Sequence, residues 1–442
     1  MQDERTIAAV ATPVGVGALA IVRMSGPAAT RVLKACTGRD LQPRRATLVR
    51  VCDANGRALD ECVATFFAAP ASFTGEDVVE LCCHGGPLVT QLVLERLLSC
   101  GASPAEPGEF SRRAFENGKL DLTQAEAVMD IIHAGSELAL RAAQHQLQGA
   151  ISRPVSEAVD ALLHVAAHVE AYIDFPEEDI APQTQQQLIE TLDNVSADLE
   201  RLLSTADLGR YLREGIRTAI IGAPNAGKSS LLNRLSGYDR AIVSPTAGTT
   251  RDTVEECISL GGLSLRLIDT AGLHDTTDAL EQSGIERTMR AWQSADLVLE
   301  VADAACPPQV LPEGPQGTPK LLVLNKCDLP EHPKWAQVAA LRISCATGAG
   351  LHALESEIRR LFMTKGCEHD SHAAINTRHR HALRQALDSL HAARTSLLAD
   401  FCELELVSID LRAALDALGT ITGRVDTEDI LTRIFSTFCL GK

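Results

Sequence analysis

The sequence predicts a multidomain protein with an α+β N-terminal domain, a split α-helical domain and an inserted α/β domain. Three observations predict this fold class. Short β-type runs alternate with Gly and Pro turns early in the chain, long stretches farther along have helical apolar spacing, and a glycine-rich loop lies near the middle. We place the bounds at 1–118 for the N-terminal domain, at 119–208 and 371–442 for the two helical halves, and at 209–370 for the inserted domain.

The N-terminal domain is predicted from its strands and one helix. Pro87 to Leu98 has the apolar spacing of a helix. The expected strands are Ile7 to Ala11, Ala18 to Val22, Thr47 to Val51, Val63 to Phe67 and Asp77 to Cys82.

The helical domain is predicted from one long apolar stripe. Its members advance in steps of three and four, and they are Leu147, Ile151, Val155, Val159, Leu162, Val165, Val169 and Ile173. Pro154 should kink the helix or mark a break, and an acidic turn from Asp174 to Asp179 should end it. Ile375 to Leu418 is helical again, so we expect the two halves to pack together around the inserted domain.

The inserted domain begins with the loop Gly222-Ala223-Pro224-Asn225-Ala226-Gly227-Lys228-Ser229. A strand before it and a helix from Lys228 bring backbone N–H groups and the positive helix end to one point, where phosphates bind. Lys228 would reach the outer phosphates, and the Ser229 hydroxyl would ligate Mg²⁺. The nucleotide-binding residues expected here are Asn225, Ala226, Gly227, Lys228, Ser229 and Ser230.

Three later motifs follow in the order expected for a GTP site. Thr250 is a candidate second Mg²⁺ ligand, within a stretch that also holds Ser244, Thr246 and Thr249. The second motif, which ends the apolar run Leu263 to Ile268, is Asp269-Thr270-Ala271-Gly272.

The third motif, Asn325-Lys326-Cys327-Asp328, ends the run Leu321 to Leu324, and Ser344-Cys345-Ala346 follows another short strand. The Asp328 carboxylate can accept from two N–H donors of guanine. Strands that end in such loops place their contacts at one edge of a parallel sheet. Together the motifs predict a GTPase. Glu300, inside the apolar run Leu297 to Ala302, has no explanation in the sequence, because an unpaired buried carboxylate is costly.

The residue that handles the attacking water is left open by the motifs. A glutamine orients that water in Ras-like GTPases, but here Leu273 stands after Gly272 and has no polar atom. Either hydrolysis is slow and acts as a timer, or a nearby carboxylate positions the water. The candidate carboxylates are Asp275, Asp278, Glu281 and Glu286. They could equally be the solvated acidic start of a helix.

Composition excludes some functions. The net charge is −17, with 58 acidic against 41 basic residues, so a broad nucleic-acid surface is not expected and any RNA contact must be local or shared with a partner. The thirteen cysteines lack a Cys-x-x-Cys pair, which favours reduced thiols in the cytoplasm. We expect no secretory signal and no membrane span.

The chain resembles the MnmE/TrmE family of tRNA-modification GTPases over almost its whole length. The resemblance extends beyond the nucleotide motifs to Ser72-Phe73-Thr74-Gly75-Glu76-Asp77, Cys83-His84-Gly85-Gly86-Pro87, Pro107-Gly108-Glu109-Phe110-Ser111, the segment from Lys119 to Ala127, the Asp174-Phe175-Pro176 turn and Cys439-Leu440-Gly441-Lys442.

The resemblance implies an N-terminal domain that binds folate and dimerises, a split helical domain and an inserted G domain. It also implies a flavin-dependent partner, MnmG, with which the protein would form a heterotetramer-type complex and install an aminomethyl-type group at C5 of the tRNA wobble uridine. The implied cofactors are GTP, Mg²⁺, K⁺ and a 5-formyl-tetrahydrofolate-type donor. Hydrolysis would depend on K⁺ and on the two G domains meeting.

The resemblance also assigns residues. Glu281 would be the catalytic glutamate that acts on the water, beside Lys228. Asn225 would ligate K⁺, together with groups from Ser244, Thr246 and Thr249. Cys439 would be linked to the modification chemistry. The folate-binding positions would be Arg23, Glu80, Lys119 and Lys442.

Two rival functions fit parts of the sequence. A ribosome-assembly GTPase of the Era or Der kind shares the nucleotide motifs, but it lacks the N-terminal module and carries an RNA-binding domain or a second G domain. A scaffold that uses GTP only to hold its shape would not need intact Lys228, Ser229, Thr250 and Asp269.

Overall fold

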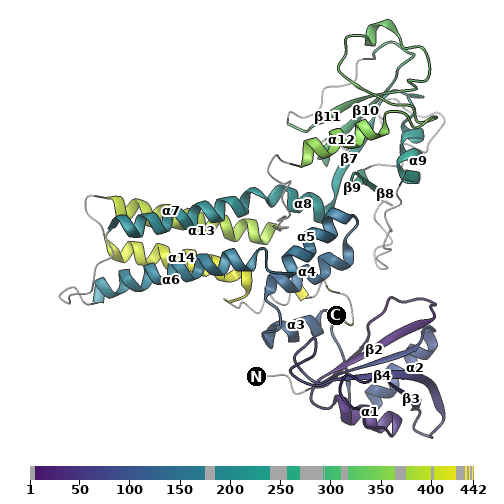
Figure 1. Cartoon of the computed structure of the whole chain (residues 1–442), viewed down its shortest axis with the longest axis vertical. Coiled ribbons are helices and arrows are strands. Elements are labelled where there is room, and N and C mark those ends of the chain that lie inside the picture. Colours follow the sequence, from purple (N-terminus) through teal and green to yellow (C-terminus); the bar gives the residue numbers. More distant parts are fainter. Residues whose placement is uncertain are drawn as a thin grey trace. The chain divides into compact units, whose positions relative to one another are not determined.

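The computed structural model describes most of the chain, which divides into two compact units (Figure 1). One unit comprises Met1–Met129 with Gly419–Lys442, and the other comprises Asp130–Leu418. The three-part bounds expected from the sequence stay a prediction. The described residues are 5–174, 185–238, 256–268, 292, 294–309, 317–363, 375–399, 403–424, 434–435, 438 and 441.

The first unit contains a six-stranded sheet in the order β3-β4-β5-β2-β1-β6. The strands from β1 to β5 overlap the five runs expected from the sequence, whereas the two-residue β6, which pairs parallel with β1, was not expected. The strands are β1 (Ile7–Val10), β2 (Leu19–Ser25), β3 (Thr47–Cys52), β4 (Ala58–Phe67), β5 (Val78–His84) and β6 (Ser103–Pro104).

Two helices cover one face of this sheet. They are α1 (Ala29–Thr37), which the sequence analysis missed, and α2 (Pro87–Ser99), which it predicted. Val32 and Leu33 of α1 and Val93 of α2 are buried in the same core as the inward side chains of the strands. Because strand side chains alternate between faces, the other face carries a different set of side chains.

The opposite face carries an apolar row across four strands. The register pairs Leu48 with Val63, Val63 with Cys82, and Cys82 with Ile21. Leu48 is 61% exposed and Val63 is 41% exposed, so the outer end of the row is open to solvent. We call Leu48, Val63, Cys82 and Ile21 the open-face row.

The rest of the first unit is helical and partly polar. Here α3 (Glu109–Glu116) and the first part of α4 (Leu122–His133) follow β6. Leu122 packs in a small core with Phe435 and Phe438. On α3 the buried Arg113 guanidinium pairs with Glu109 and with Glu76, which satisfies a charge that would otherwise be costly to bury.

In the second unit a group of long helices brings distant segments together (Figure 1). α7 packs against both α6 and α13, and an ion pair of 2.6 Å joins Arg412 to Glu170. The helices of this unit are α5 (Glu137–Leu147), α6 (Ser152–Asp174), α7 (Gln185–Ser204), α8 (Ala206–Glu214), α13 (Thr377–Leu398) and all but the last turn of α14 (Leu404–Thr422).

Pro154 lies where a helix break was expected. α5 ends at Leu147 and α6 begins at Ser152, so Pro154 falls in the first turn of α6. A proline is tolerated there because the first turn has no intrahelical partner for its missing N–H. Most of the stripe beyond it is buried, from Val155 to Val169. The expected acidic turn after Asp174 lies outside the described residues.

The second unit also holds a six-stranded sheet in the order β12-β11-β10-β7-β9-β8, parallel except for the edge pair β8–β9. Two helices, α9 (Lys228–Tyr238) and α12 (Leu351–Phe362), share one core with this sheet, and a short 3-10 helix spans Pro333–Trp335. The strands are β7 (Ile216–Ile221), β8 (Glu256–Leu260), β9 (Leu263–Ile268), β10 (Leu297–Asp303), β11 (Lys320–Asn325) and β12 (Leu341–Arg342).

The start of β10 is tied to its neighbours by Asp296. This carboxylate accepts hydrogen bonds from Arg210 at 2.9 Å and from Arg217 at 3.1 Å. Burial opposes ionisation of Asp296, but the hydrogen bonds from the two arginines outweigh it, so the pKa of this carboxyl lies below its usual value. The ion pairs therefore stabilise the junction of α8, β7 and β10.

Glu300, which the sequence left unexplained, has a partner. Its carboxylate lies 2.6 Å from the Lys320 ammonium group at the start of the adjacent β11. The side chain of Glu300 is 14% exposed, so the pair offsets the cost of a largely buried charge. Among the described helices, none combines the length and the apolar character needed to cross a membrane.

Candidate nucleotide-binding site

The loop between β7 and α9 wraps tightly against the sheet. At Gly222 the backbone φ is +150°, and an added Cβ would lie 2.1 Å from the Val301 carbonyl oxygen. At Gly227 φ is +96°, and an added Cβ would lie 2.1 Å from Nδ2 of Asn325. Only glycine fits such positions, so the two glycines allow the loop to curl between the ends of β10 and β11.

Lys228 lies inside this curl. Its ammonium group donates to the carbonyl oxygens of Gly222 and Ala223, both at 2.9 Å. Burial lowers the pKa of Lys228, and an anion bound beside this partly buried ammonium group would stabilise its charge. Ser229 and Ser230 follow in the first turn of α9, at the positive end of the helix dipole. The loop therefore fits a phosphate group.

Asn325 joins three loops at the sheet edge. Its side chain is 2% exposed. Its Nδ2 donates to the carbonyl oxygen of Ala226 at 3.1 Å, and its Oδ1 accepts from the backbone N–H of Cys345 at 3.1 Å. One buried amide thus connects the phosphate loop to the two segments that the sequence predicted for the base.

The segment from Ser344 to Ala346 is held beside Asp328. The Ser344 hydroxyl, which is buried, donates to Asp328 Oδ1 at 2.5 Å. This hydrogen bond orients the carboxylate expected to read guanine. Cys345 takes part through its backbone rather than its thiol, and burial raises the pKa of that thiol.

Lys326 reaches back to the phosphate loop. Its backbone has φ of 65° and that of Asn225 has φ of 64°, both in the left-handed region that non-glycine residues rarely adopt. The Lys326 ammonium group donates to the Asn225 carbonyl oxygen at 3.1 Å and to Asp303 Oδ2 at 2.6 Å. Asp303 was not among the residues that the sequence analysis selected.

The structure brings together the predicted residues of the phosphate loop, of the Asn325–Asp328 segment and of the Ser344–Ala346 segment. The other residues predicted for this site lie outside the part of the chain that the structure describes. The residues outside it are Ser244, Thr246, Thr249, Thr250, Asp269, Thr270, Ala271, Gly272 and Glu281.

Two of the four positions assigned to folate are paired in the first unit. Arg23 and Glu80 face each other across β2 and β5, with Nε to Oε1 at 2.9 Å. Arg23 also donates to the Gly441 carbonyl oxygen at 3.2 Å, and it lies 5.8 Å from the ring centres of Phe73 and Phe110. In contrast, Lys119 contacts the carbonyl oxygen of Pro70 at 3.1 Å, and both Lys442 and Cys439 lie outside the described residues.

Family models match nearly the whole chain. The model described as the N-terminus of the GTP-binding protein TrmE matches residues 6–119, and the model described as the MnmE helical domain matches residues 122–439. The chain belongs to the MnmE family of tRNA modification GTPases.

Full-length relatives carry the same family name. A protein of Akkermansia muciniphila named tRNA modification GTPase MnmE is 57% identical over 446 residues, with 99% of each chain covered. One of Opitutus terrae with the same name is 46% identical, again with 99% of each chain covered. A solved structure of the FeoB G-domain from Methanococcus jannaschii is 22% identical and has a TM-score of 0.23, covering 34% of this chain and 98% of that one.

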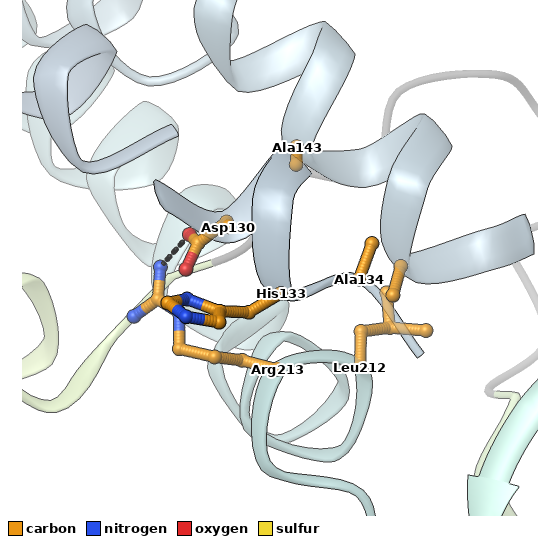
Figure 2. A pocket seen from close by; sticks show the side chains of 7 residues that line it. Asp130, His133, Ala134, Ala143, Leu212 and Arg213 are labelled. Carbon is orange, nitrogen blue, oxygen red and sulfur yellow. Dashed lines mark hydrogen bonds and ion pairs between the residues drawn. The ribbon is translucent and has the colours of Figure 1, made fainter. Parts of the chain in front are cut away.

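This MnmE-family protein has another pocket, apart from the nucleotide loops, which lies in the second unit among α4, α5 and α8 (Figure 2). There the Arg213 guanidinium is directed at the Asp130 carboxylate, 2.5 Å away, and His133 lies beside it. None of the residues predicted for GTP or folate lines this pocket.

Proposed function

We propose that this chain is a K⁺-dependent GTPase that works with a flavin-dependent, MnmG-like partner to install an aminomethyl-type group at C5 of the tRNA wobble uridine. Membership of the MnmE family supports the tRNA-modification role. The observation that carries the GTP site is the buried Asn325 amide, which joins the phosphate loop to the base-side loop. A ribosome-assembly GTPase is not favoured, because the family models match the regions flanking the GTP motifs.

In this proposal the phosphates of GTP lie in the curl of the Gly222–Ser229 loop. Lys228 would exchange its two carbonyl partners for phosphate oxygens. Ser229, with Thr250, would hold Mg²⁺, which neutralises phosphate charge when bound. Asp269 to Gly272 would lie near the γ-phosphate. At the other end, Asp328 would accept from the guanine edge, beside the Ser344–Ala346 segment.

Hydrolysis would depend on K⁺ and on Glu281. The left-handed backbone of Asn225 supports a special role for this residue, and its side-chain oxygen, together with groups from Ser244, Thr246 and Thr249, would hold the ion. A cation between the phosphates supplies the charge stabilisation that an arginine provides in other GTPases. Because Leu273 has no polar atom, we assign the attacking water to Glu281. Hydrolysis would be coupled to the meeting of two G domains.

The first unit would bind a 5-formyl-tetrahydrofolate-type donor. Glu80, already paired with Arg23, could instead accept from adjacent N–H groups of a pterin, and Arg23, Lys119 and Lys442 could hold the glutamyl tail. The ring of Phe73, which is partly exposed beside Arg23, supports a planar ligand there, whereas Phe110 is fully buried beneath it in the core. Cys439, near the same chain end, would take part in the modification chemistry.

The assembly would be a homodimer formed through the N-terminal domain, joined by the MnmG-like flavoprotein in the cytoplasm. The exposed part of the open-face row supports the dimer, because Leu48 and Val63 are paired apolar side chains that a second copy would remove from water. The net charge of −17 indicates that tRNA contacts are local or supplied by the partner.

The K⁺ mechanism is tested by measuring GTP turnover by the purified protein in K⁺ and in Na⁺. We expect turnover to be at least about tenfold faster in K⁺, since the ion offsets charge that develops between the phosphates. Glu281→Ala should keep its affinity for GTP and lose turnover. Equal rates in the two salts would contradict the role of K⁺, and a Glu281→Ala protein with normal turnover would contradict the role of Glu281.

A further inference from the structure

Asp303 ends β10 at the edge of the sheet where the nucleotide loops meet. It pairs in register with Asn325, the last residue of β11, so Lys326 follows directly beside it. The Asp303 side chain is 16% exposed and that of Lys326 is 36% exposed, so the ion pair between them is partly shielded from water. Such pairs hold a side chain more firmly than pairs on an open surface.

Lys326 is fixed at its far end by two acceptors of different kinds. The Asp303 carboxylate, at 2.6 Å, supplies the charge, and the Asn225 carbonyl oxygen, at 3.1 Å, supplies a dipole from the phosphate loop. A lysine anchored through its ammonium group presents its methylene groups as a fixed apolar surface, on which a planar ring can pack.

We propose that Asp303 is a positioning residue for guanine-nucleotide binding, which acts by holding Lys326 extended between the base-side loop and the phosphate loop. This inference rests on the proposed GTP site. Asp303 acts through Lys326 and does not itself contact the nucleotide. Without its charge, Lys326 would lose its stronger anchor and would spend part of the time in other rotamers, so binding would have to pay for ordering it.

The geometry offers a substitution that removes the charge and little else. Asp303 Oδ1 also accepts from the backbone N–H of Ala305 at 2.9 Å, which shapes the turn after β10. Asn can keep that acceptor, so Asp303→Asn should preserve the turn. The pKa of the Asp303 carboxyl lies below its usual value, because the hydrogen bonds from Lys326 and Ala305 outweigh the effect of burial. The charge is therefore present at neutral pH.

The test measures nucleotide binding and steady-state GTP turnover by full-length Asp303→Asn. We expect Kd for GDP and KM for GTP to rise roughly threefold to tenfold, with kcat changed less than KM, because Lys326 acts mainly on the position of the base. Inosine nucleotides lack one guanine N–H donor but keep the ring face. Asp303→Asn should therefore raise the Kd for inosine nucleotides by the same factor as the Kd for guanine nucleotides. An unchanged Kd for GDP, or a loss confined to guanine nucleotides, would overturn the proposal.

Asp296→Asn is the matched control, at the residue just before the other end of the same strand. It removes a carboxylate that also binds basic side chains, Arg210 and Arg217, but lies away from the nucleotide loops. We expect it to lower the melting temperature and to leave Kd for GDP unchanged. An equal rise in Kd for GDP in the two variants would show that losing an ion pair at either end of β10 weakens GDP binding. That result would overturn a specific role for Asp303.

A second variant covers the case in which Asp303→Asn folds poorly. Lys326→Met keeps the stem and removes the ammonium group. If Asp303 acts through Lys326, adding Asp303→Asn to Lys326→Met should cause no further loss of GDP affinity. Additive losses would overturn the proposal. Failure of the wild-type protein to bind GDP would instead contradict the proposed function itself, so the two failures are distinguishable.

Discussion

At the scale of single residues, the site depends on backbone positions that only certain side chains tolerate. Gly222 and Gly227 allow the loop to touch Val301 and Asn325, and no Cβ fits at either point. Asn225 and Lys326 adopt left-handed backbone conformations without being glycine. Strained positions of this kind persist where the surroundings hold them in place, and here they surround the proposed phosphate and base sites.

Gly227→Ala tests the close contact at the phosphate loop. The added methyl would meet Asn325 Nδ2 at 2.1 Å, at a φ of +96°, so the amide that joins the three loops must move. We expect at least a tenfold loss of GDP affinity, measured by titration calorimetry.

Gly38→Ala is the matched control for that prediction. Gly38 also has a positive φ, +67°, but an added Cβ would meet nothing within 4 Å. It therefore shares the backbone strain of about 1–2 kcal/mol without the clash, and it should lower stability without changing GDP affinity. Normal GDP binding by Gly227→Ala would contradict our view of this loop.

The roles of residues could be predicted where they belong to a sequence motif. They could not be predicted where a residue gains its partner only through the pairing of two strands. The spacing from Gly222 to Ser229 and from Asn325 to Asp328 indicates its chemistry directly. Asp303 and Glu300 acquire their partners, Lys326 and Lys320, only through the register of β10 with β11. No local pattern in the sequence encodes that register, so Asp303 was missed and Glu300 stayed unexplained.

At the scale of elements, apolar patterns predicted the longer pieces. The runs before the nucleotide motifs became the strands β7, β9 and β11, the run from Leu297 to Ala302 became β10, and the apolar stripe became α6. The helix α1 was missed although Ala29, Val32, Leu33 and Cys36 have helical spacing and are buried. The strand β6 could not be predicted, because two residues carry no periodicity and its pairing with β1 is long-range.

The open-face row makes an element-scale prediction. Val63→Glu places a charge in the exposed part of the row, next to Leu48. If the dimer forms through this face, the charge would have to be desolvated, so we expect monomers by light scattering.

Leu163→Glu is the control for the dimer prediction. Leu163 lies on α6 and is 49% exposed, similar to the 41% of Val63, but it lies outside the sheet. This variant should stay dimeric. A Val63→Glu protein that remains a dimer would contradict the use of this face.

At the scale of the whole molecule, the chain combines a mostly parallel sheet that carries the nucleotide motifs, a group of long helices and an N-terminal α+β unit. The family models match 6–119 and 122–439, which places the nucleotide motifs within a longer matched region. An acidic chain of net charge −17 is a poor general binder of nucleic acid. A partner that contributes to tRNA binding is consistent with this charge.

We propose that GTP hydrolysis by this protein drives modification of tRNA wobble uridines. The most direct measurement is mass spectrometry of those uridines in a strain that lacks the gene and is complemented with wild type or with Glu281→Ala. We expect the C5 aminomethyl-type group to be absent without the gene, restored by wild type and not restored by Glu281→Ala. Wobble uridines that keep their C5 modification in the strain without the gene would contradict the account.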